Sequence, residues 1–251
     1  AKLLITDTQF SPTMKKALKI YAKNIPIIDI HDDQAVFKDG EGEKIGEMTY
    51  EEFLQTGDDN FNWSLPEDEW QAISLSYTSG TTGKPKGVVY HHRGSYLMST
   101  GSVTAWNMPN KLTFLYTVPM FHCNGWGYPW TAALIHAKII CCRYIVAKDI
   151  YNLIDKYKVT HFGGAPIVLS LIANADEKDK KEINHKVYVL TAGAPPTSAI
   201  LEKMDNLGFE VMHVYGLTET YGHILQCAWN EEWESQSKSE KADIKARQGV
   251  R

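Results

Sequence analysis

The sequence lacks a hydrophobic run long enough to cross a membrane. A membrane-spanning helix needs about 20 consecutive apolar residues, and the longest candidate, residues 130–142, is interrupted by His136 and Lys138. Residues 1–7 do not have the charged, apolar and small-residue regions of a signal peptide. The chain begins with Ala1 rather than Met, which suggests that it is cut at its front. We therefore expect a cytoplasmic protein without a transmembrane segment.

An excess of positive charge and closely spaced cysteine pairs are also missing. The chain has 26 Lys and Arg residues against 30 Asp and Glu residues, for a net charge of -4. This balance argues against a nucleic-acid partner, because phosphate backbones require a basic surface. The four cysteines have no CxxC spacing and lie among apolar and aromatic residues. We expect them to be reduced, buried thiols rather than a disulfide or a zinc site.

The sequence does contain a regular alternation of strand-like and helix-like segments. This pattern predicts an α/β fold of layered parallel sheets flanked by helices. The expected strands are residues 2–6, 25–30, 72–77, 88–90, 112–118, 138–145, 160–162, 186–191 and 210–215. The expected helices are residues 11–23, 48–55, 93–106, 128–136, 150–157, 167–175 and 198–207.

Two polar segments have no place in this alternation. Residues 57–69 contain a proline and scattered aromatic residues, and we expect a surface connection rather than a domain boundary. Residues 230–251 are charged and poor in aliphatic side chains. They are either a surface helix or a segment whose partner is missing.

Residues 77–87, YTSGTTGKPKG, form a loop between two predicted strands. Its glycines let the backbone approach a ligand, its hydroxyl and N–H groups can bind phosphate oxygens, and its two lysines add positive charge. The loop is not a Walker A motif, because two residues rather than four separate Gly80 from Gly83 and a proline follows Lys84. A flexible linker would need neither the lysines nor the proline. The loop therefore indicates a polyphosphate ligand.

This loop resembles the signature of the AMP-forming acyl-activating enzymes, which include acyl-CoA synthetases, peptide-synthetase adenylation domains and beetle luciferases. The resemblance implies that the chain is part of the large N-terminal domain of an acyl-CoA synthetase. It also implies that the loop holds the β- and γ-phosphates of ATP. The ATP-site residues that it implies are Thr78, Ser79, Gly80, Thr81, Thr82, Gly83, Lys84 and Lys86, with Thr78 also near Mg²⁺.

A second motif, residues 215–219 (YGLTE), follows the last predicted strand. Open α/β sheets bind ligands at the carboxyl ends of their strands, and a glutamate is a suitable oxygen ligand for Mg²⁺. The motif resembles the YGxTE element of the same family. That resemblance implies that Tyr215 flanks the adenine, Thr218 contacts the α-phosphate and Glu219 binds Mg²⁺. The ATP-site residues expected in this region are His213, Val214, Tyr215, Gly216 and Thr218.

The turn at residues 191–196, TAGAPP, also follows a predicted strand. Its chemistry alone favours a simple turn. The family resemblance implies instead that Gly193, Ala194 and Pro195 lie against the adenine.

Residues 119–126, PMFHCNGW, resemble the family segment that carries a histidine near the α-phosphate and the substrate carboxylate. The resemblance assigns that place to His122, although a lone histidine after a strand is more often structural. Trp126 is a candidate gate of the acyl pocket, with core packing as a near-equal alternative. Gly163 and Gly164 resemble another wall of that pocket.

The resemblance implies a two-step reaction. A carboxylate attacks the α-phosphate of ATP to give an acyl adenylate and pyrophosphate, and the thiol of CoA then displaces AMP. The expected catalytic residues are His122, Thr218 and Glu219, and the expected ligands are ATP, Mg²⁺ and CoA. The protein mainly positions these groups and neutralises phosphate charge. The alternative is a non-catalytic module that binds ATP or an acyl adenylate.

The sequence around the phosphate loop, residues 61–83 and 87–99, resembles medium-chain fatty acyl-CoA synthetases. It also resembles methylmercaptopropionate ligases and plant acyl-activating enzymes, which favours a fatty or thioether acid as the substrate. The family's ribose-binding aspartate, hinge and small C-terminal domain are not in this sequence. We therefore expect residues 1–251 to be an incomplete ATP- and acyl-binding N-terminal domain, poorly active alone. The family often forms homodimers, so a homodimer is also an expectation.

Overall fold

The computed structural model describes residues 2–78 and 83–249. It divides the chain into two compact units, Ala1–Leu65 and Pro66–Arg251. The division falls inside residues 57–69, so the expectation that this segment is not a boundary is wrong. Residues 54–65 are exposed throughout, including the aromatic rings of Phe61 and Trp63.

The first unit is a three-stranded parallel sheet with the order β1-β2-β3. Its elements are β1 (Leu4–Asp7), η1 (Thr8–Phe10), α1 (Ser11–Tyr21), β2 (Ile27–Ile30), β3 (Met48–Thr49) and α2 (Tyr50–Leu54). Helix α1 has a proline in its first turn and ends at Ala22, which has a left-handed φ of 52°. Helix α2 begins with a capping box between Thr49 and Glu52. The predicted strand, helix, strand and helix are confirmed in this unit, whereas the short strand β3 was not predicted.

The second unit is built on a six-stranded sheet with the order β11-β10-β9-β8-β6-β7. Its strands are β6 (Thr113–Tyr116), β7 (Lys138–Cys141), β8 (His161–Gly164), β9 (Val187–Thr191), β10 (Phe209–Gly216) and β11 (His223–Gln226). Every neighbouring pair is parallel except β10 and β11. The expected parallel sheet is confirmed, whereas β11 was not predicted.

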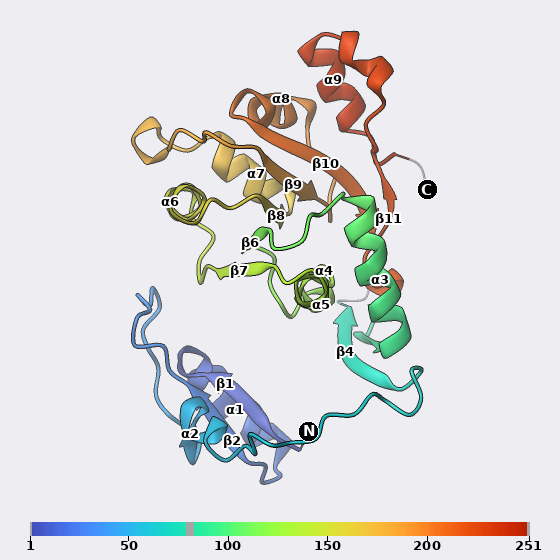
Figure 1. Ribbon diagram of the computed structural model, residues 1–251. Helices are drawn as coiled ribbons and strands as arrows, with labels where there is room; N and C mark the ends of the chain where they lie inside the picture. The colour runs from blue at the N-terminus through green and yellow to red at the C-terminus, as the bar shows by residue number, and fades with distance from the viewer. Residues whose placement is uncertain (1, 79–82, 250–251) are drawn as a thin grey trace. The chain divides into compact units, whose positions relative to one another are not determined.

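Helices cover both faces of this sheet (Figure 1). They are α3 (His92–Ala105), α4 (Cys123–Trp126), α5 (Tyr128–Leu134), α6 (Ala147–Tyr157), α7 (Pro166–Ala173), α8 (Ser198–Asn206) and α9 (Lys238–Lys245), with the short turns η2 (Glu177–Asp179), η3 (Thr218–Thr220) and η4 (Glu231–Ser235). Side chains alternate along each strand. Val187 and Val189 of β9 pack in the core on the side of α6, α7 and α8. Leu190 packs on the other side with Trp106 and Tyr128.

The predicted phosphate loop connects the two strands of an antiparallel hairpin. Strands β4 (Ala72–Thr78) and β5 (Lys86–His91) pair with each other, and Thr78 lies opposite Lys86. Both strands were predicted from the sequence, but their direct pairing was not.

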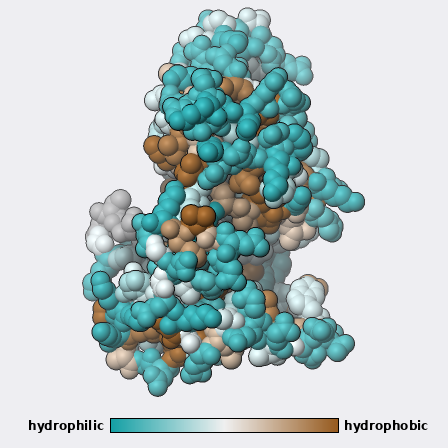
Figure 2. Space-filling model, turned by 90° about the vertical axis from the view of Figure 1, so that its left-hand side faces the viewer, coloured by the Kyte–Doolittle hydropathy of each residue, from teal (hydrophilic) through white to brown (hydrophobic). Residues whose placement is uncertain are grey.

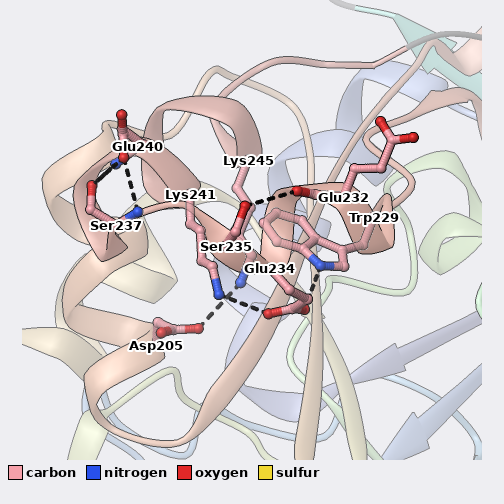
Figure 3. Close-up of polar contacts among 9 residues, drawn as sticks. All are labelled: Asp205, Trp229, Glu232, Glu234, Ser235, Ser237, Glu240, Lys241 and Lys245. Carbon is pink, nitrogen blue, oxygen red and sulfur yellow. Dashed lines mark hydrogen bonds and ion pairs between the residues drawn. The ribbon is translucent and has the colours of Figure 1, made fainter.

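The charged tail forms helix α9, and Figure 3 shows the polar contacts around it. Ser237 caps the helix in a capping box with Glu240, and Lys245 forms an ion pair of 3.2 Å with Asp205 of α8. Ala242, which is 3% exposed, belongs to the core. Of the two alternatives for this tail, the surface helix is confirmed for Lys238–Lys245.

Hydrophilic residues cover most of the face shown in Figure 2, with hydrophobic residues in separate patches. Scattered apolar side chains are ordinary on a protein surface. In the part of the chain that the structure describes, no helix is long and apolar enough to cross a membrane.

Candidate active site

The carboxyl ends of strands β6, β8, β9 and β10 meet at one edge of the sheet, because these strands run parallel. A cavity of about 230 Å³ lies there. The wall of this cavity includes six of the residues expected at the active site: His122, Trp126, Gly193, Val214, Gly216 and Thr218. Three motifs that are far apart in the sequence therefore meet in one place.

The segment after β6 reaches this cavity through a left-handed turn. Residues 123–127 all have positive φ values, between 43° and 77°. Left-handed backbone costs an L-residue about 1–2 kcal/mol, and three residues of this turn are not glycine. Such strain persists only where surrounding contacts hold it. The turn carries His122 and Trp126, both of which line the cavity.

Two hydrogen bonds hold the left-handed turn. Ser74 Oγ of β4 donates to Asn124 Oδ1 at 2.6 Å, and the Tyr116 hydroxyl donates to the main-chain oxygen of Gly125 at 3.0 Å. A Cβ atom on Gly125 would lie 2.0 Å from the Tyr116 hydroxyl oxygen. This position therefore requires glycine for both its conformation and its lack of a side chain.

Thr218 of the YGLTE motif is held from two sides. Its Oγ1 lies 3.2 Å from Cys123 Sγ, and its main-chain oxygen accepts a hydrogen bond of 2.6 Å from the Tyr90 hydroxyl. Burial raises the pKa of Tyr90, so this hydroxyl keeps its proton as a donor. The Tyr90 ring stacks on Tyr221 at 4.3 Å, and the Tyr221 hydroxyl accepts the main-chain N–H of His91 at 2.9 Å. These contacts tie strand β5 of the hairpin to the YGLTE segment.

The described part of the phosphate loop is exposed to solvent. Gly83, Lys84 and Lys86 are all exposed, and Thr78 is half-buried at the end of β4. Because both lysine side chains are exposed, a polyphosphate can reach their positive charges. Four other expected ATP-site residues, Ser79, Gly80, Thr81 and Thr82, lie outside the described residues.

The residues expected to contact Mg²⁺ are Glu219 and Thr78. Glu219 is an exposed carboxylate in η3, next to Thr218. Among residues 2–78 and 83–249, no cluster of three or more His, Cys, Asp or Glu residues could hold a metal ion by itself. Mg²⁺ usually takes one or two protein carboxylates and completes its shell with phosphate oxygens and water. One carboxylate and one hydroxyl fit an ion that arrives with ATP.

His213 is not among the residues that line the cavity, and its expected role at the ATP site stays a prediction. Its side chain is 0% exposed, and its Nδ1 lies 3.0 Å from the main-chain oxygen of Ala246. Burial lowers its pKa. Adjacent residues of a strand point to opposite faces, and Val214 occupies the cavity side. His213 therefore faces the other side of the sheet.

The two glycines of β8 also differ in their surroundings. A Cβ atom on Gly163 would lie 3.2 Å from the Trp126 ring, whereas one on Gly164 would lie 3.0 Å from Val168 of α7. Only Gly163 therefore makes room for the cavity wall. Gly164 lets helix α7 pack closely against the sheet, and its expected place in the wall of the acyl pocket stays a prediction.

Three further expected residues flank the cavity without lining it. Tyr215 pairs with Leu225 of β11, while Ala194 and Pro195 are exposed in the turn after Gly193. Other residues of the cavity wall were not predicted from the sequence, among them Cys123, Tyr128 and His223. Tyr128 stands at the start of a predicted helix directly after the His122 motif, and that proximity was the available signal. His223 belongs to the unpredicted strand β11.

This chain matches a family model and is similar to proteins of known activity. The family model described as AMP-binding enzyme matches residues 1–244. A peroxisomal acetate/butyrate–CoA ligase of Arabidopsis thaliana is 51% identical over 207 residues, which cover 82% of this chain and 36% of the relative. An acetate–CoA ligase of Humulus lupulus is 45% identical over 260 residues, which cover 100% of this chain and 46% of the relative. The chain therefore spans less than half the length of these two relatives.

A solved structure shares the fold. The N-terminal domain of FACL13 from Mycobacterium tuberculosis matches with a TM-score of 0.72 and 18% sequence identity, over 96% of this chain and 55% of that chain. The expected α/β architecture of an N-terminal domain is thereby confirmed.

Proposed function

This chain belongs to the AMP-binding enzyme family, and from that premise we propose that it supplies the ATP- and acyl-binding part of an acyl-CoA ligase. The ligase joins a short carboxylic acid to CoA and releases AMP and pyrophosphate. The proposal is carried by the convergence of His122, Trp126 and Thr218 on one cavity. Thr218 is tied through Tyr90 to the strand that follows the two-lysine loop.

In the first step, one group of residues binds the phosphates of ATP and His122 binds the carboxylate of the acid. Lys84 and Lys86 neutralise the β- and γ-phosphates, while Thr218 donates to the α-phosphate. His122 is exposed beside Thr218 in the same wall, where it can hold the incoming carboxylate. An oxygen of the acid bonds to the α-phosphorus as the bond to pyrophosphate breaks. Glu219 and Thr78 would hold Mg²⁺, and the ion would supply positive charge for the phosphates when bound.

The second step transfers the acyl group. The sulfur of CoA bonds to the carbonyl carbon of the adenylate, AMP leaves with the bonding electron pair, and the thiol proton passes to solvent. AMP is a far better leaving group than the oxide of a free carboxylate. No covalent intermediate with a side chain of the enzyme is required.

We propose a short acid because the cavity is small. Its volume of about 230 Å³ lies below the roughly 300–1,000 Å³ of sites for drug-sized ligands. The Trp126 ring stands over Gly163, and we infer that it limits the depth of the cavity, whose wall it forms in part. The names of the two plant relatives mention acetate and butyrate. Among fatty and thioether acids, these features favour those with only a few chain atoms.

We further propose that the whole protein acts in the cytoplasm as a homodimer. The Arabidopsis relative is named as a peroxisomal enzyme, so the peroxisome is the alternative compartment. Imaging of the tagged whole polypeptide and its mass in solution distinguish these alternatives.

In the direct test, the polypeptide that contains this chain is incubated with ATP, Mg²⁺, CoA and one acid at a time. Acetate, butyrate and 3-(methylthio)propionate are expected to give AMP and the acyl-CoA in equal amounts, and decanoate much less of both. Faster turnover of decanoate than of butyrate would contradict the short-acid proposal. Binding of ATP without either product would favour the non-catalytic module.

A further inference from the structure

The thiol of Cys123 contacts a residue of the proposed ATP site. Its Sγ atom lies 3.2 Å from Thr218 Oγ1, in a motif 95 positions further along the chain, and both residues line the cavity. Within residues 2–78 and 83–249, the Thr218 hydroxyl has no other hydrogen-bond partner. Since Thr218 is proposed to bind the α-phosphate, the thiol stands directly beside the phosphate site.

Both members of this contact are held in place by further hydrogen bonds. Cys123 begins the left-handed turn with a φ of 45°, and the next residue, Asn124, accepts a bond of 2.6 Å from Ser74 Oγ. On the other side, the main-chain oxygen of Thr218 accepts a bond of 2.6 Å from the Tyr90 hydroxyl. A left-handed conformation at a residue other than glycine is kept only where surrounding contacts hold it. At Cys123, this conformation coincides with the contact to Thr218.

The number of protons in the pair determines how Thr218 can bind a phosphate. A threonine hydroxyl has one proton to donate and two lone pairs that accept, whereas a thiol is a weak donor. A phosphate oxygen without a proton can only accept, so it takes the single proton of Thr218. The hydroxyl can then accept the thiol proton of Cys123, because another acceptor in reach, His122 Nε2, lies further away at 3.9 Å. Hydrogen bonds in such a chain strengthen one another.

We propose that Cys123 is a positioning residue for the adenylation step, whose thiol donates a hydrogen bond to Thr218 Oγ1 and so directs the hydroxyl proton of Thr218 to the α-phosphate of ATP. Cys123 acts through Thr218, and in this role it neither transfers a proton nor forms a covalent bond. The inference rests on the proposed function, because it requires Thr218 to bind the α-phosphate.

Two variants of Cys123 in the polypeptide that contains this chain test the inference. Cys123→Ala removes the donor, whereas Cys123→Ser keeps a donor at the same position. The measurement is kcat/KM for ATP in the formation of AMP, with butyrate and CoA at saturation. This value is expected to fall about tenfold in Cys123→Ala. The Cys123→Ser variant should stay within about threefold of wild type.

Coupling to Thr218 separates positioning from a purely structural role. In a Thr218→Val background there is no hydroxyl to direct, so Cys123→Ala should change kcat/KM by less than about twofold. If this background is too slow to measure, the comparison of Cys123→Ala with Cys123→Ser decides. Cys141→Ala is the matched control, because Cys141 is an exposed cysteine of β7 outside the cavity wall. It should keep the kinetics of wild type.

Cys123→Gly provides a second variant without the thiol, and glycine adopts a φ of 45° without strain. It should fold and lose about as much kcat/KM as Cys123→Ala. Kinetics of wild type in either variant would overturn the inference. Equal losses in Cys123→Ala and Cys123→Ser would also overturn it, as would a loss of about tenfold that persists in the Thr218→Val background. A wild-type polypeptide that forms no AMP with any acid would contradict the proposed function itself.

Discussion

The hydroxyl of Tyr90 donates a hydrogen bond of 2.6 Å to the main-chain oxygen of Thr218, which lies 128 positions further along the chain. Tyr90 belongs to β5, the strand that follows the phosphate loop, and Thr218 begins η3. Tyr90, which donates this bond, is buried with an exposed fraction of 1%. It therefore couples the segment proposed to bind the β- and γ-phosphates to the one proposed to bind the α-phosphate.

Replacing Tyr90 with Phe removes this bond while keeping the ring that stacks on Tyr221. The Thr218 oxygen then loses a buried partner, which costs about 1–3 kcal/mol. We expect a fall of about tenfold in kcat/KM for ATP. Steady-state kinetics with ATP varied measure this effect. Tyr96→Phe serves as the control, because Tyr96 is 61% exposed on α3, and equal kinetics of the two variants would show that the Tyr90 bond has no role.

Gly125→Ala should disrupt the left-handed turn. Its added Cβ atom would lie 2.0 Å from the Tyr116 hydroxyl oxygen, at a φ of 62°. Overpacking and left-handed strain together predict a loss of about 2–4 kcal/mol in the free energy of unfolding. Denaturant unfolding measures this loss.

The double variant Gly125→Ala with Tyr116→Phe separates the two causes. It removes the clashing oxygen, so part of the stability should return. Gly101→Ala is the control, because a Cβ atom there meets nothing within 4 Å inside α3. That change should stabilise the protein by about 0.5–1 kcal/mol. A Gly125→Ala protein as stable as wild type would contradict this account of the turn.

Trp126→Ala should let longer acids into the cavity. If the Trp126 ring limits the depth of the pocket, its removal raises the ratio of kcat/KM for octanoate over butyrate by about tenfold or more, since each methylene group is worth a factor of about 10 or greater. Rates across an acid series from acetate to decanoate give this ratio. Trp63→Ala is the control, because Trp63 is 72% exposed. A uniform loss with all acids, together with lower stability, would instead support the core-packing role of Trp126.

Low pH should destabilise the protein through protonation of His161 in the unfolded chain. This side chain is 2% exposed, and burial lowers its pKa to about 4 from the ordinary value of 6.5. Above pH 6.5 it is neutral in both states, whereas below that the unfolded chain takes up the proton first. Stability is therefore lost as pH falls from 6.5 to about 4, by about 3 kcal/mol in full.

The variant His161→Phe keeps an aromatic ring between Trp106 and Tyr188, whose centroids lie 5.0 Å and 4.9 Å away. It should lose about 2 kcal/mol less stability than wild type between pH 7 and pH 4.5. Urea unfolding at both pH values measures this difference. His136→Asn, at an exposed residue with a φ of 53°, should leave the pH dependence unchanged. Parallel stability curves for wild type and His161→Phe would contradict the assignment.

The alternation of strands and helices was predicted well, because hydrophobic periodicity is a local property of the sequence. Alternating strands and helices imply a parallel sheet, and parallel strands bring residues such as Gly193 and Thr218 to the same edge. The opposite orientations of His213 and Val214 could have been foreseen, since neighbouring residues on one strand face opposite sides of the sheet. Strand β11 could not be foreseen, because its four residues become a strand only by pairing with β10.

Other features of the site depend on contacts between distant parts of the chain. The left-handed turn at residues 123–127 is held by Ser74 and Tyr116, and neither contact leaves a local pattern in the sequence. The contact between Cys123 and Thr218 is likewise made only in the folded chain. A cysteine that follows a histidine does not reveal which hydroxyl it will contact.

The most direct test of the central claim is the exchange of labelled pyrophosphate into ATP, without CoA, by the polypeptide that contains this chain. We expect exchange that depends on an added short acid such as acetate or butyrate. That result would establish reversible formation of an acyl adenylate. Measurable binding of ATP with no exchange for any acid would contradict acid activation and leave a nucleotide-binding module in its place.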